Sequence, residues 1–233
     1  MSSTTSHQLP KHVGYIIDGN RRWAKQHGIP VYEGHLAGYN ALKEVAYATF
    51  EQGVEYMSAY IFSTENWQRS ASEVKKLMSL VLKLLTSDLP ELKDNNVRLR
   101  VIGTRDGVDP KIIKAIDKAE VETAHCRGGT LLLCFNYGGR QEIVDAIRTI
   151  VNQAAASQEI TEALVAQQLY APDVPDVDIV VRTSGEQRLS NFMLWRAAYS
   201  ELLFLEKCWP DMTKDDVSFI MKEYARRNRR FGA

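Results

Sequence analysis

The stretch that decides the fold is Gly14-Tyr15-Ile16-Ile17-Asp18-Gly19-Asn20-Arg21-Arg22-Trp23-Ala24-Lys25. Residues 13–17 form an apolar run that does not alternate with polar residues, which predicts a buried strand. The run stops at Asp18-Gly19-Asn20, residue types that accept tight turns. A carboxylate at such a strand end can hold a hard cation such as Mg²⁺. The following arginines can bind phosphate oxygens. Two interpretations stay open at this point: a metal-bridged phosphate site, or an ordinary turn with solvated arginines.

The composition is that of a globular protein. The chain has 233 residues, of which 45% are hydrophobic and 25% charged, and this length suits one sizeable α/β domain. The formal net charge is zero. Nothing global therefore indicates a nucleic-acid partner, and any anion site must be a local cluster of charges.

Cysteine usage and the chain start bear on location. Cys126, Cys134 and Cys208 lie far apart and form no Cys-x-x-Cys motif, which favours a reducing, cytoplasmic location and buried, unpaired thiols. The start of the chain is polar and has no signal-peptide core, so we expect a disordered lead-in over residues 1–10 and one domain over 11–233. No apolar stretch approaches the roughly 20 residues of a membrane span. Contact with a membrane surface stays open.

Strand and helix patterns alternate along the chain. Strands are expected at residues 13–17, 56–62, 97–102, 131–135, 178–181 and 201–205. Helices are expected from Gly34-His35 to Gly53, over residues 74–92 with Pro90 ending or bending the helix, from Pro110, after residues 136–140, over 162–169, and after Trp209-Pro210-Asp211. Residues 154–177 are expected to form a surface excursion. This order predicts a single α/β domain with a mostly parallel six-stranded sheet flanked by helices.

Four of the predicted strands end in polar clusters. These clusters are Asp18-Gly-Asn-Arg-Arg, Ser63-Thr-Glu-Asn-Trp-Gln-Arg, Asn136-Tyr-Gly-Gly-Arg and Arg182-Thr-Ser-Gly-Glu-Gln-Arg. In parallel sheets, ligands bind outside the carboxyl ends of the strands, so the clusters should converge on one rim that suits a polyphosphate. The chain has no P-loop, no G-x-G-x-x-G fingerprint and no His/Cys metal cluster. The sequence thus predicts a phosphate enzyme without a nucleotide-binding fold.

These motifs resemble those of the cis-prenyltransferases, the family that includes undecaprenyl diphosphate synthase. The resemblance is carried by residues 12–25, Gly34-His35-Leu-Ala-Gly38, residues 62–69, 136–140 and 182–195, Ala198-Tyr-Ser-Glu-Leu202, Trp209-Pro-Asp211 and Arg229-Arg-Phe-Gly232. It spans nearly the whole chain in the family's order. It implies that an allylic diphosphate loses diphosphate as isopentenyl diphosphate attacks its C1, with a Z double bond in the product. The long apolar helix from Val74 would then wall a tunnel for the growing chain.

The resemblance also implies roles for individual residues. Catalytic roles fall to Asp18, Asn66, Arg69 and His35. Substrate contacts fall to Gly19, Asn20, Arg21, Arg22, Trp23, His35, Ser63, Glu65, Trp67, Arg69, Arg182, Arg188 and Ser190. Mg²⁺ would be held by Asp18 and by Glu201, the latter contributed across a homodimer. Glu186 would support the pocket, and residues 136–140 would be architectural.

Departures from the family pattern point to the product. Arg21 stands where many bacterial members have glycine, and Val31 stands where the family has an arginine, so Arg21 is a candidate substitute. Ser70 and Ala233 replace the usual proline and glycine. Ile61 fills a position where long-chain members have a small residue. A larger side chain there should shorten the tunnel, which predicts a product of about C10 to C20 rather than C55.

Three alternatives stay open. Some relatives join two allylic units head-to-middle, with possible cyclisation, and the missing arginine at Val31 leaves room for that chemistry. A second alternative is a catalytically silent partner subunit, against which the full set of predicted catalytic residues argues. The third is an α/β domain whose arginines have no catalytic role.

Overall fold

Across residues 9–153 and 160–227, which the computed structural model describes, six strands form one fully parallel sheet in the order β3-β4-β2-β1-β5-β6. The predicted fold class is confirmed, and the sheet is entirely rather than mostly parallel. The strands are β1 (His12–Ile16), β2 (Tyr56–Ser63), β3 (Val97–Ile102), β4 (Gly129–Tyr137), β5 (Ile179–Arg182) and β6 (Glu201–Phe204). Most of the predicted lead-in, and Arg229 and Arg230 of the basic tail, lie outside the described residues.

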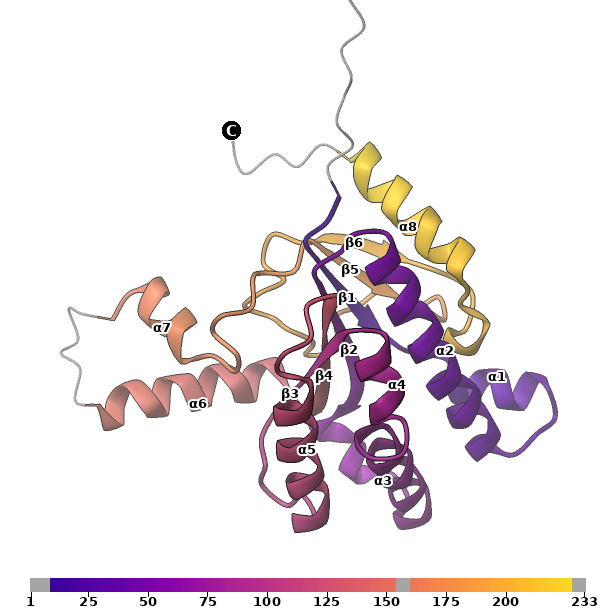
Figure 1. Cartoon of the computed structure of the whole chain (residues 1–233), viewed down its shortest axis with the longest axis horizontal. Helices are drawn as coiled ribbons and strands as arrows, with labels where there is room; N and C mark the ends of the chain where they lie inside the picture. The colour runs from indigo at the N-terminus through magenta and orange to yellow at the C-terminus, as the bar shows by residue number, and fades with distance from the viewer. Residues whose placement is uncertain (1–8, 154–159, 228–233) are drawn as a thin grey trace, which may run out of the picture.

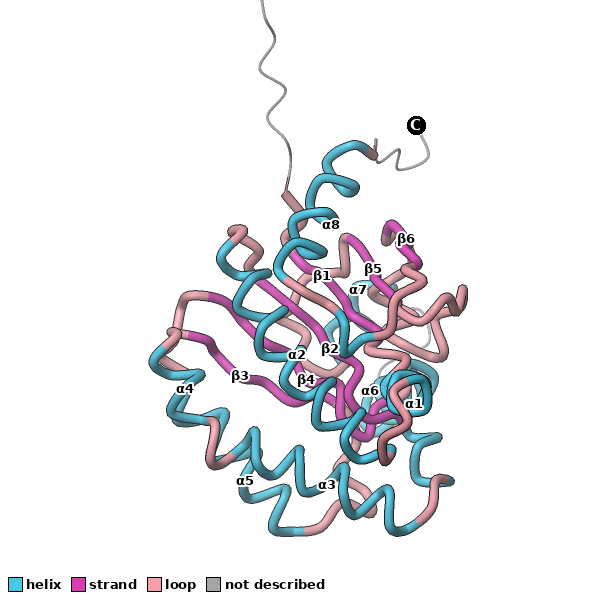
Figure 2. The backbone as a smooth tube through the Cα atoms, turned by 90° about the vertical axis from the view of Figure 1, so that its right-hand side faces the viewer, coloured by secondary structure: helices cyan, strands magenta, loops and turns pink. Residues whose placement is uncertain are grey.

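The helices lie on both faces of the sheet (Figures 1 and 2). They are α1 (Asn20–Gln26), α2 (Val31–Glu51), α3 (Ala71–Leu85), α4 (Leu89–Asp94), α5 (Pro110–Thr123), α6 (Gly139–Asn152), α7 (Glu162–Gln168) and α8 (Lys214–Arg226), with short 3₁₀ turns η1 (Thr64–Gln68) and η3 (Trp209–Asp211). The larger hydrophobic core lies between the sheet and helices α2, α3, α4, α5 and α8. The smaller core lies on the other face, under the irregular segments 170–177 and 189–197.

Strand β1 lies at the centre of the sheet and is apolar after its first residue, His12. All five of its residues are buried, and it pairs with β2 on one side and β5 on the other. A strand buried on both faces needs the non-alternating apolar run that the sequence shows. Asp18 follows β1 at the carboxyl edge of the sheet, between the ends of β2 and β5, which are far apart in sequence.

Two β-bulges distort the strands beside β1. Tyr60 pairs with Cys134 and Phe62 with Phe135, so Ile61 is an extra residue on β2; Ser63 then pairs with Tyr137, which leaves Asn136 extra on β4. Asn136 takes a left-handed φ of 48°. Bulges re-aim side chains at strand ends. Here the bulge turns both Ile61 and Phe62 toward the larger core, so both side chains lie on the face covered by α2, α3, α4, α5 and α8.

Helix α2 crosses the start of α1 at close range, which explains the Gly34-His35-x-x-Gly38 motif. A Cβ on Gly38 would lie 2.1 Å from Asn20 Oδ1, and one on Gly34 would lie 2.2 Å from the Asn20 carbonyl oxygen. Both distances are far inside van der Waals contact. The two glycines therefore let α1 and its arginines sit directly against the helix that carries His35.

One predicted helix is divided near the proline that was expected to end or bend it. The single helix over residues 74–92 is two helices, because α3 ends at Leu85 and α4 begins at Leu89. Pro90 has no N–H and its ring would clash with the Thr86 carbonyl of a continuous helix, so the chain breaks ahead of it. The structure also adds α1 and begins α2 at Val31. The predicted role of Gly53 as the glycine that closes this helix is confirmed: it follows α2 with a φ of 93°.

Residues 154–177 are not wholly a surface excursion. Leu169, Val174 and Val177 are almost fully buried. The buried Arg196 guanidinium donates to the carbonyls of Tyr170, Ala171 and Val174 over 2.6–3.0 Å and ties this segment to the smaller core. Residues 154–159 lie outside the described part of the chain. The sequence pattern missed this packing because short irregular segments have no periodicity to detect.

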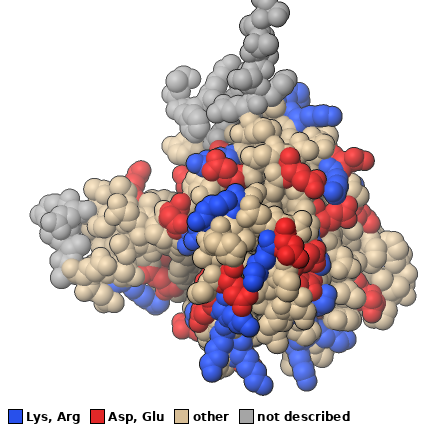
Figure 3. Space-filling view, viewed as in Figure 1, with Lys and Arg blue, Asp and Glu red and all other residues tan. Residues whose placement is uncertain are grey.

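Other properties of the surface and core match the composition. Acidic and basic side chains are interspersed over the face seen in Figure 3, in keeping with the zero net charge. The three cysteines are buried and unpaired, as expected. None of the helices in the described ranges is both long and apolar enough to cross a membrane.

The close crossing of α1 and α2 gives a stability prediction. Gly38→Ala should lower the free energy of unfolding by about 1–3 kcal/mol, because the added methyl group must push Asn20 away in an already packed contact. Urea unfolding measures the change. Gly28→Ala is the matched control: nothing lies within 4 Å of that Cβ, and only its φ of +65° opposes the substitution. An effect at Gly38 no larger than at Gly28 would contradict the steric explanation.

Candidate active site

Three of the four polar clusters at the strand ends line two cavities that meet there, whereas residues 136–140 line neither. The first, the deep cavity, has a volume of about 380 Å³; the second, the rim cavity, has about 510 Å³. They share Ile17, Asp18, Tyr60, Asn66 and Arg69. Two ligands bound in the two cavities would therefore meet at one carboxylate, one amide and one guanidinium group.

The deep cavity has a polar mouth and an apolar interior. Its mouth is lined by Asp18, Gly19, Asn20, Arg21, Arg22, His35, Asn66, Arg69 and Ser184. Its interior is lined by Ile17, Tyr39, Leu42, Ile61, Phe62, Leu77, Leu80, Val81 and Leu84. Helices α2 and α3 and the end of β2 supply most of this interior. An amphiphile with an anionic head and a hydrocarbon tail fits such a cavity.

The rim cavity is lined mainly by residues with polar or charged side chains. Apart from the shared residues it is lined by Ile16, Ser63, Glu65, Arg182, Ser190 and Asn191. It has no apolar extension like that of the deep cavity. A small anionic ligand suits it better than a long-chain one.

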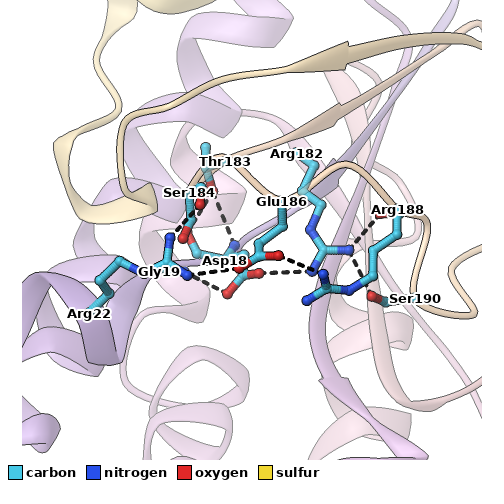
Figure 4. Close-up of polar contacts among 9 residues, drawn as sticks. All are labelled: Asp18, Gly19, Arg22, Arg182, Thr183, Ser184, Glu186, Arg188 and Ser190. Carbon is cyan, nitrogen blue, oxygen red and sulfur yellow. Dashed lines mark hydrogen bonds and ion pairs between the residues drawn. The ribbon is translucent and has the colours of Figure 1, made fainter.

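The centre of the rim is an ion pair between the ends of β1 and β5 (Figure 4). Arg182 Nη2 donates to Asp18 Oδ2 at 2.8 Å, and the Arg182 side chain is only 4% exposed while that of Asp18 is 38% exposed. The second carboxylate oxygen accepts the Gly19 N–H at 2.8 Å. Arg182 Nη1 also donates to the Arg188 carbonyl and to Ser190 Oγ. The carboxylate is thus held in place from the protein side and faces the cavities.

The loop after β5 wraps around this ion pair in a strained conformation. Ser184, Ser190, Asn191 and Met193 all have positive φ, which non-glycine residues seldom adopt. Thr183 Oγ1 donates to the Asp18 carbonyl at 2.6 Å and accepts the Asp18 N–H at 3.1 Å. Strain of this kind gathers where a loop must place specific groups, so the loop geometry supports a functional rim.

A carboxylate bridges two of the predicted phosphate-binding arginines. Glu186 accepts Arg22 Nη2 at 2.8 Å and Arg188 Nη1 at 2.5 Å, and Arg22 Nη1 also donates to the Ser184 carbonyl. The hydrogen bonds from Arg22 and Arg188 lower the pKa of Glu186. Arg188 does not line either cavity, but Glu186 links it to Arg22, which does.

Sequence reasoning missed Glu73, on the first turn of α3. Its Oε1 lies 3.2 Å from His35 Nε2, 3.1 Å from Arg69 Nη1 and 4.0 Å from Arg21 Nε, and its side chain is only 14% exposed. One carboxylate therefore gathers three cationic or titratable groups from α1, α2 and the end of η1. Helical spacing gave no signal for this pair, because Arg69 lies before α3 in an extended conformation.

His35 is tuned by these neighbours. Burial lowers its pKa, the hydrogen bond and charge of Glu73 oppose that effect, and the charges of Arg69 and Arg21 add to it; the net pKa lies below the ordinary value. His35 is thus inclined to be neutral near pH 7, with one ring nitrogen at the cavity mouth.

Asn66 and its neighbours are fixed by the turn η1. The Ser63 N–H donates to Asn66 Oδ1 at 3.1 Å in a capping box, which holds the Asn66 amide at the boundary of the two cavities. Trp67 instead donates to Asn136 Oδ1 at 2.7 Å and packs on Phe62. The structure therefore brings Ser63, Glu65, Asn66 and Arg69 to the cavities, but not Trp67.

Two other predicted residues lie away from the cavities. Trp23 donates to Asp211 Oδ1 at 2.7 Å and anchors α1 to η3. Glu201 starts β6, level with Ile179 and hence with Val13, so it lies toward the opposite end of the sheet from Asp18. It is paired with Arg227 at 3.0 Å. Within one chain Glu201 does not reach Asp18, and its predicted role at a metal would need a second copy.

The residues present fit a Mg²⁺ ion that is shared with a ligand. Among the described residues no group of three or more His, Cys, Asp or Glu side chains could hold a metal. Asp18 offers a partly exposed carboxylate at the rim. Mg²⁺ is commonly bound by one or two carboxylates together with substrate phosphates and water. A single carboxylate beside phosphate-binding arginines matches that mode.

Val31, which stands where the family has an arginine, lies away from the deep cavity. Val31 is the first residue of α2, is 38% exposed and does not line the deep cavity. Arg21 does line it, with a 63% exposed side chain that lies beside Glu73. The position of Arg21 is compatible with its predicted role as a substitute.

Comparisons with known proteins agree with the site. The prenyltransferase family model described as undecaprenyl diphosphate synthase matches residues 16–232. This chain belongs to the cis-prenyltransferase family. An isoprenyl transferase of Thermotoga maritima is 44% identical, over 97% of each chain. A decaprenyl diphosphate synthase of Mycobacterium leprae is 46% identical, over 97% of this chain and 78% of that protein.

A solved structure is also similar to this cis-prenyltransferase. The lavandulyl diphosphate synthase of Lavandula x intermedia, in complex with dimethylallyl diphosphate, has a TM-score of 0.92 at 33% identity, over 97% of this chain and 99% of that one. The predicted family resemblance is thus confirmed by sequence and by fold.

The Glu73 cluster gives a prediction that needs no substrate. Glu73→Gln should lower the pKa of His35 further, because it removes the negative charge that opposes burial and the neighbouring arginines. Titration of the His35 ring by NMR measures this pKa. Glu91→Gln, which removes a carboxylate that does not contact His35, serves as control and should leave the pKa unchanged. A His35 pKa that rises or stays constant in Glu73→Gln would refute the electrostatic coupling.

Proposed function

We propose that the protein condenses an allylic diphosphate with isopentenyl diphosphate to a Z-configured polyprenyl diphosphate of short or medium length. The observation that carries this proposal is the pair of cavities that meet at Asp18, Asn66 and Arg69, of which only one continues into an apolar interior. The allylic substrate places its tail in the deep cavity, and isopentenyl diphosphate occupies the rim cavity.

The reaction balances without a redox partner. The C1–O bond of the allylic diphosphate breaks, and the electron pair leaves with the diphosphate. The C4=C3 double bond of isopentenyl diphosphate attacks C1, and loss of a proton from C2 restores a double bond. The product is longer by five carbons and returns to the deep cavity as the next allylic substrate.

The residues at the cavity mouth stabilise the leaving diphosphate. Arg21, Arg22 and the N–H groups at the start of α1 supply donors. His35 donates its Nε2–H, which must shift from Glu73 to the diphosphate to do so. Asn66 and Arg69, at the boundary, orient the two substrates against each other. Arg182 and Ser190 hold the isopentenyl diphosphate group, and Arg182 must shift part of its hydrogen bonding from Asp18 to do so.

We infer that Mg²⁺ is the cofactor, held by Asp18 together with substrate diphosphate and, in a homodimer, by Glu201. The ion neutralises charge that develops on the leaving diphosphate. A homodimer, a cytoplasmic location and peripheral membrane contact for long products complete the proposal. The low net charge and the absence of any nucleic-acid motif in the sequence leave no reason to propose a nucleic-acid partner.

The second candidate function is a head-to-middle condensation of two allylic diphosphates. The specific observations in its favour are the similarity to the lavandulyl diphosphate synthase and the replacement of the family arginine by Val31. Both candidates use the same deep cavity for the allylic substrate. They differ in what enters the rim cavity.

Turnover assays separate these functions. The purified protein with Mg²⁺ should convert dimethylallyl diphosphate and isopentenyl diphosphate to longer Z-prenyl diphosphates, and dimethylallyl diphosphate alone should give no product. Asp18→Asn should reduce turnover by about 10²–10³-fold, since it weakens stabilisation of the leaving group. Asp173→Asn, at a residue paired with Arg100 and remote from the cavities, is the control. Product from dimethylallyl diphosphate alone would favour the head-to-middle reaction; no turnover with any primer would favour a silent subunit.

Ile61 should limit product length. The β2 bulge points its side chain into the deep cavity, so Ile61→Ala should lengthen the main product by at least one C5 unit. Mass spectrometry of the dephosphorylated products measures the change. A long polyprenyl product from the wild-type enzyme would refute the short-chain expectation.

A further inference from the structure

We propose that Tyr39, held by its hydroxyl on Asp88, is a specificity-determining residue that fixes how long a hydrocarbon tail the deep cavity accepts. This proposal rests on the proposed function and identifies what limits the chain length of its product. It concerns the seam between α2 and α3, away from the diphosphate-binding residues.

The length of the deep cavity follows from the helices that line it. On α2 the lining runs from His35 through Tyr39 to Leu42, and on α3 from Leu77 to Leu84. Seven residues of helix span about 10 Å. An extended chain of about eight carbon–carbon bonds covers that distance. The last lining residue on α3, Leu84, is next to the final residue of that helix, at the break before α4.

Tyr39 connects α2 to this break. Its ring lines the deep cavity and its hydroxyl donates to Asp88 Oδ2 at 2.5 Å, across to the link between α3 and α4. Burial and the neighbouring Asp88 carboxylate raise the pKa of Tyr39, so the hydroxyl stays protonated and donates at any physiological pH. The ring cannot turn away from the cavity without giving up this bond.

Asp88 is itself held by charge. Its side chain is only 10% exposed, and it accepts Lys43 Nζ at 3.0 Å and Lys83 Nζ at 3.4 Å in addition to Tyr39. The two ammonium groups lie 5.8 and 4.9 Å from the centre of the Tyr39 ring. Lys43 also binds Glu91, on α4, at 2.7 Å. These contacts, from α2, α3, the link and α4, close the seam around one ring.

A growing tail would meet this cluster as a polar obstacle. To pass between α2 and the α3–α4 link, the tail must displace the Tyr39 ring. The Tyr39 hydroxyl then loses Asp88, and hydrocarbon comes to lie against Asp88 and its two lysines. Burying unpaired polar groups is costly. The cluster therefore limits the length of the tail. If its role were only to hold the helices together, substitutions in it would change stability and leave tail length unchanged.

Product analysis tests this proposal. Tyr39→Ala should lengthen the main product by at least one C5 unit, and Tyr39→Phe, which removes only the hydroxyl, should add longer products to the wild-type distribution. Tyr47→Phe is the matched control: it removes a hydroxyl that donates to Glu91 in the same seam, at a residue that does not line the cavity, and should change stability alone. A product distribution that is unchanged in Tyr39→Ala would overturn the proposal. A distribution that changes in Tyr39→Ala but not in Tyr39→Phe would overturn the role of Asp88.

A binding series tests the same limit without turnover. Calorimetry with linear prenyl monophosphates of ten, fifteen and twenty carbons should show wild-type affinity that stops rising along the series. In Tyr39→Ala, or in Tyr39→Leu if the alanine variant does not fold, affinity should continue to rise. Identical affinity profiles for wild type and variant would refute the role of Tyr39, whether or not the enzyme makes a prenyl product. Absence of any prenyl product would refute the proposed function alone.

Discussion

The structure depends on the ion pair between Asp18 and Arg182. It joins the ends of two adjacent central strands, β1 and β5, at the point where two cavities meet. A buried guanidinium needs a partner, and Arg182 finds one in the single carboxylate that projects from the end of β1. Because the pair holds the carboxylate at the rim, the following turn and α1 direct their donors toward the same space. The strained loop at residues 183–193 wraps around this pair.

The position of α2 is the second constraint. Two glycines let α1 lie against α2, so the arginines of α1 and the histidine of α2 reach the same cavity mouth. From there α2 and α3 run side by side along the deep cavity, joined at one end by Glu73 and at the other by Asp88. The two acidic residues have different surroundings. Glu73 faces groups suited to an anionic ligand, and Asp88 faces a tyrosine and two lysines that close the seam.

Much of the fold could be predicted from sequence because its signals are local. The non-alternating run before Asp18 identifies a central strand, and the repeated strand-to-polar-cluster pattern identifies a parallel sheet with a functional rim. Family motifs then identified most of the residues that line the two cavities. A break near Pro90 was predicted from that proline, although the helix ends earlier, at Leu85. The burial of Leu169, Val174 and Val177 was not predicted. This burial depends on packing against distant segments, which the spacing of residues within one segment does not encode.

The sequence by itself determined the family, the fold class and the chemical types at the rim, because each follows from residue identity and short spacings. Only the tertiary structure showed that Glu73 gathers His35, Arg69 and Arg21, that Trp23, Trp67 and Glu201 stand away from the cavities of the single chain, and that Tyr39 closes the seam onto Asp88. The stretch from Gly14 to Lys25 supplies hydrogen-bond donors and the Asp18 carboxylate. Their partners come from positions up to 188 residues away, and only folding brings them within hydrogen-bonding distance.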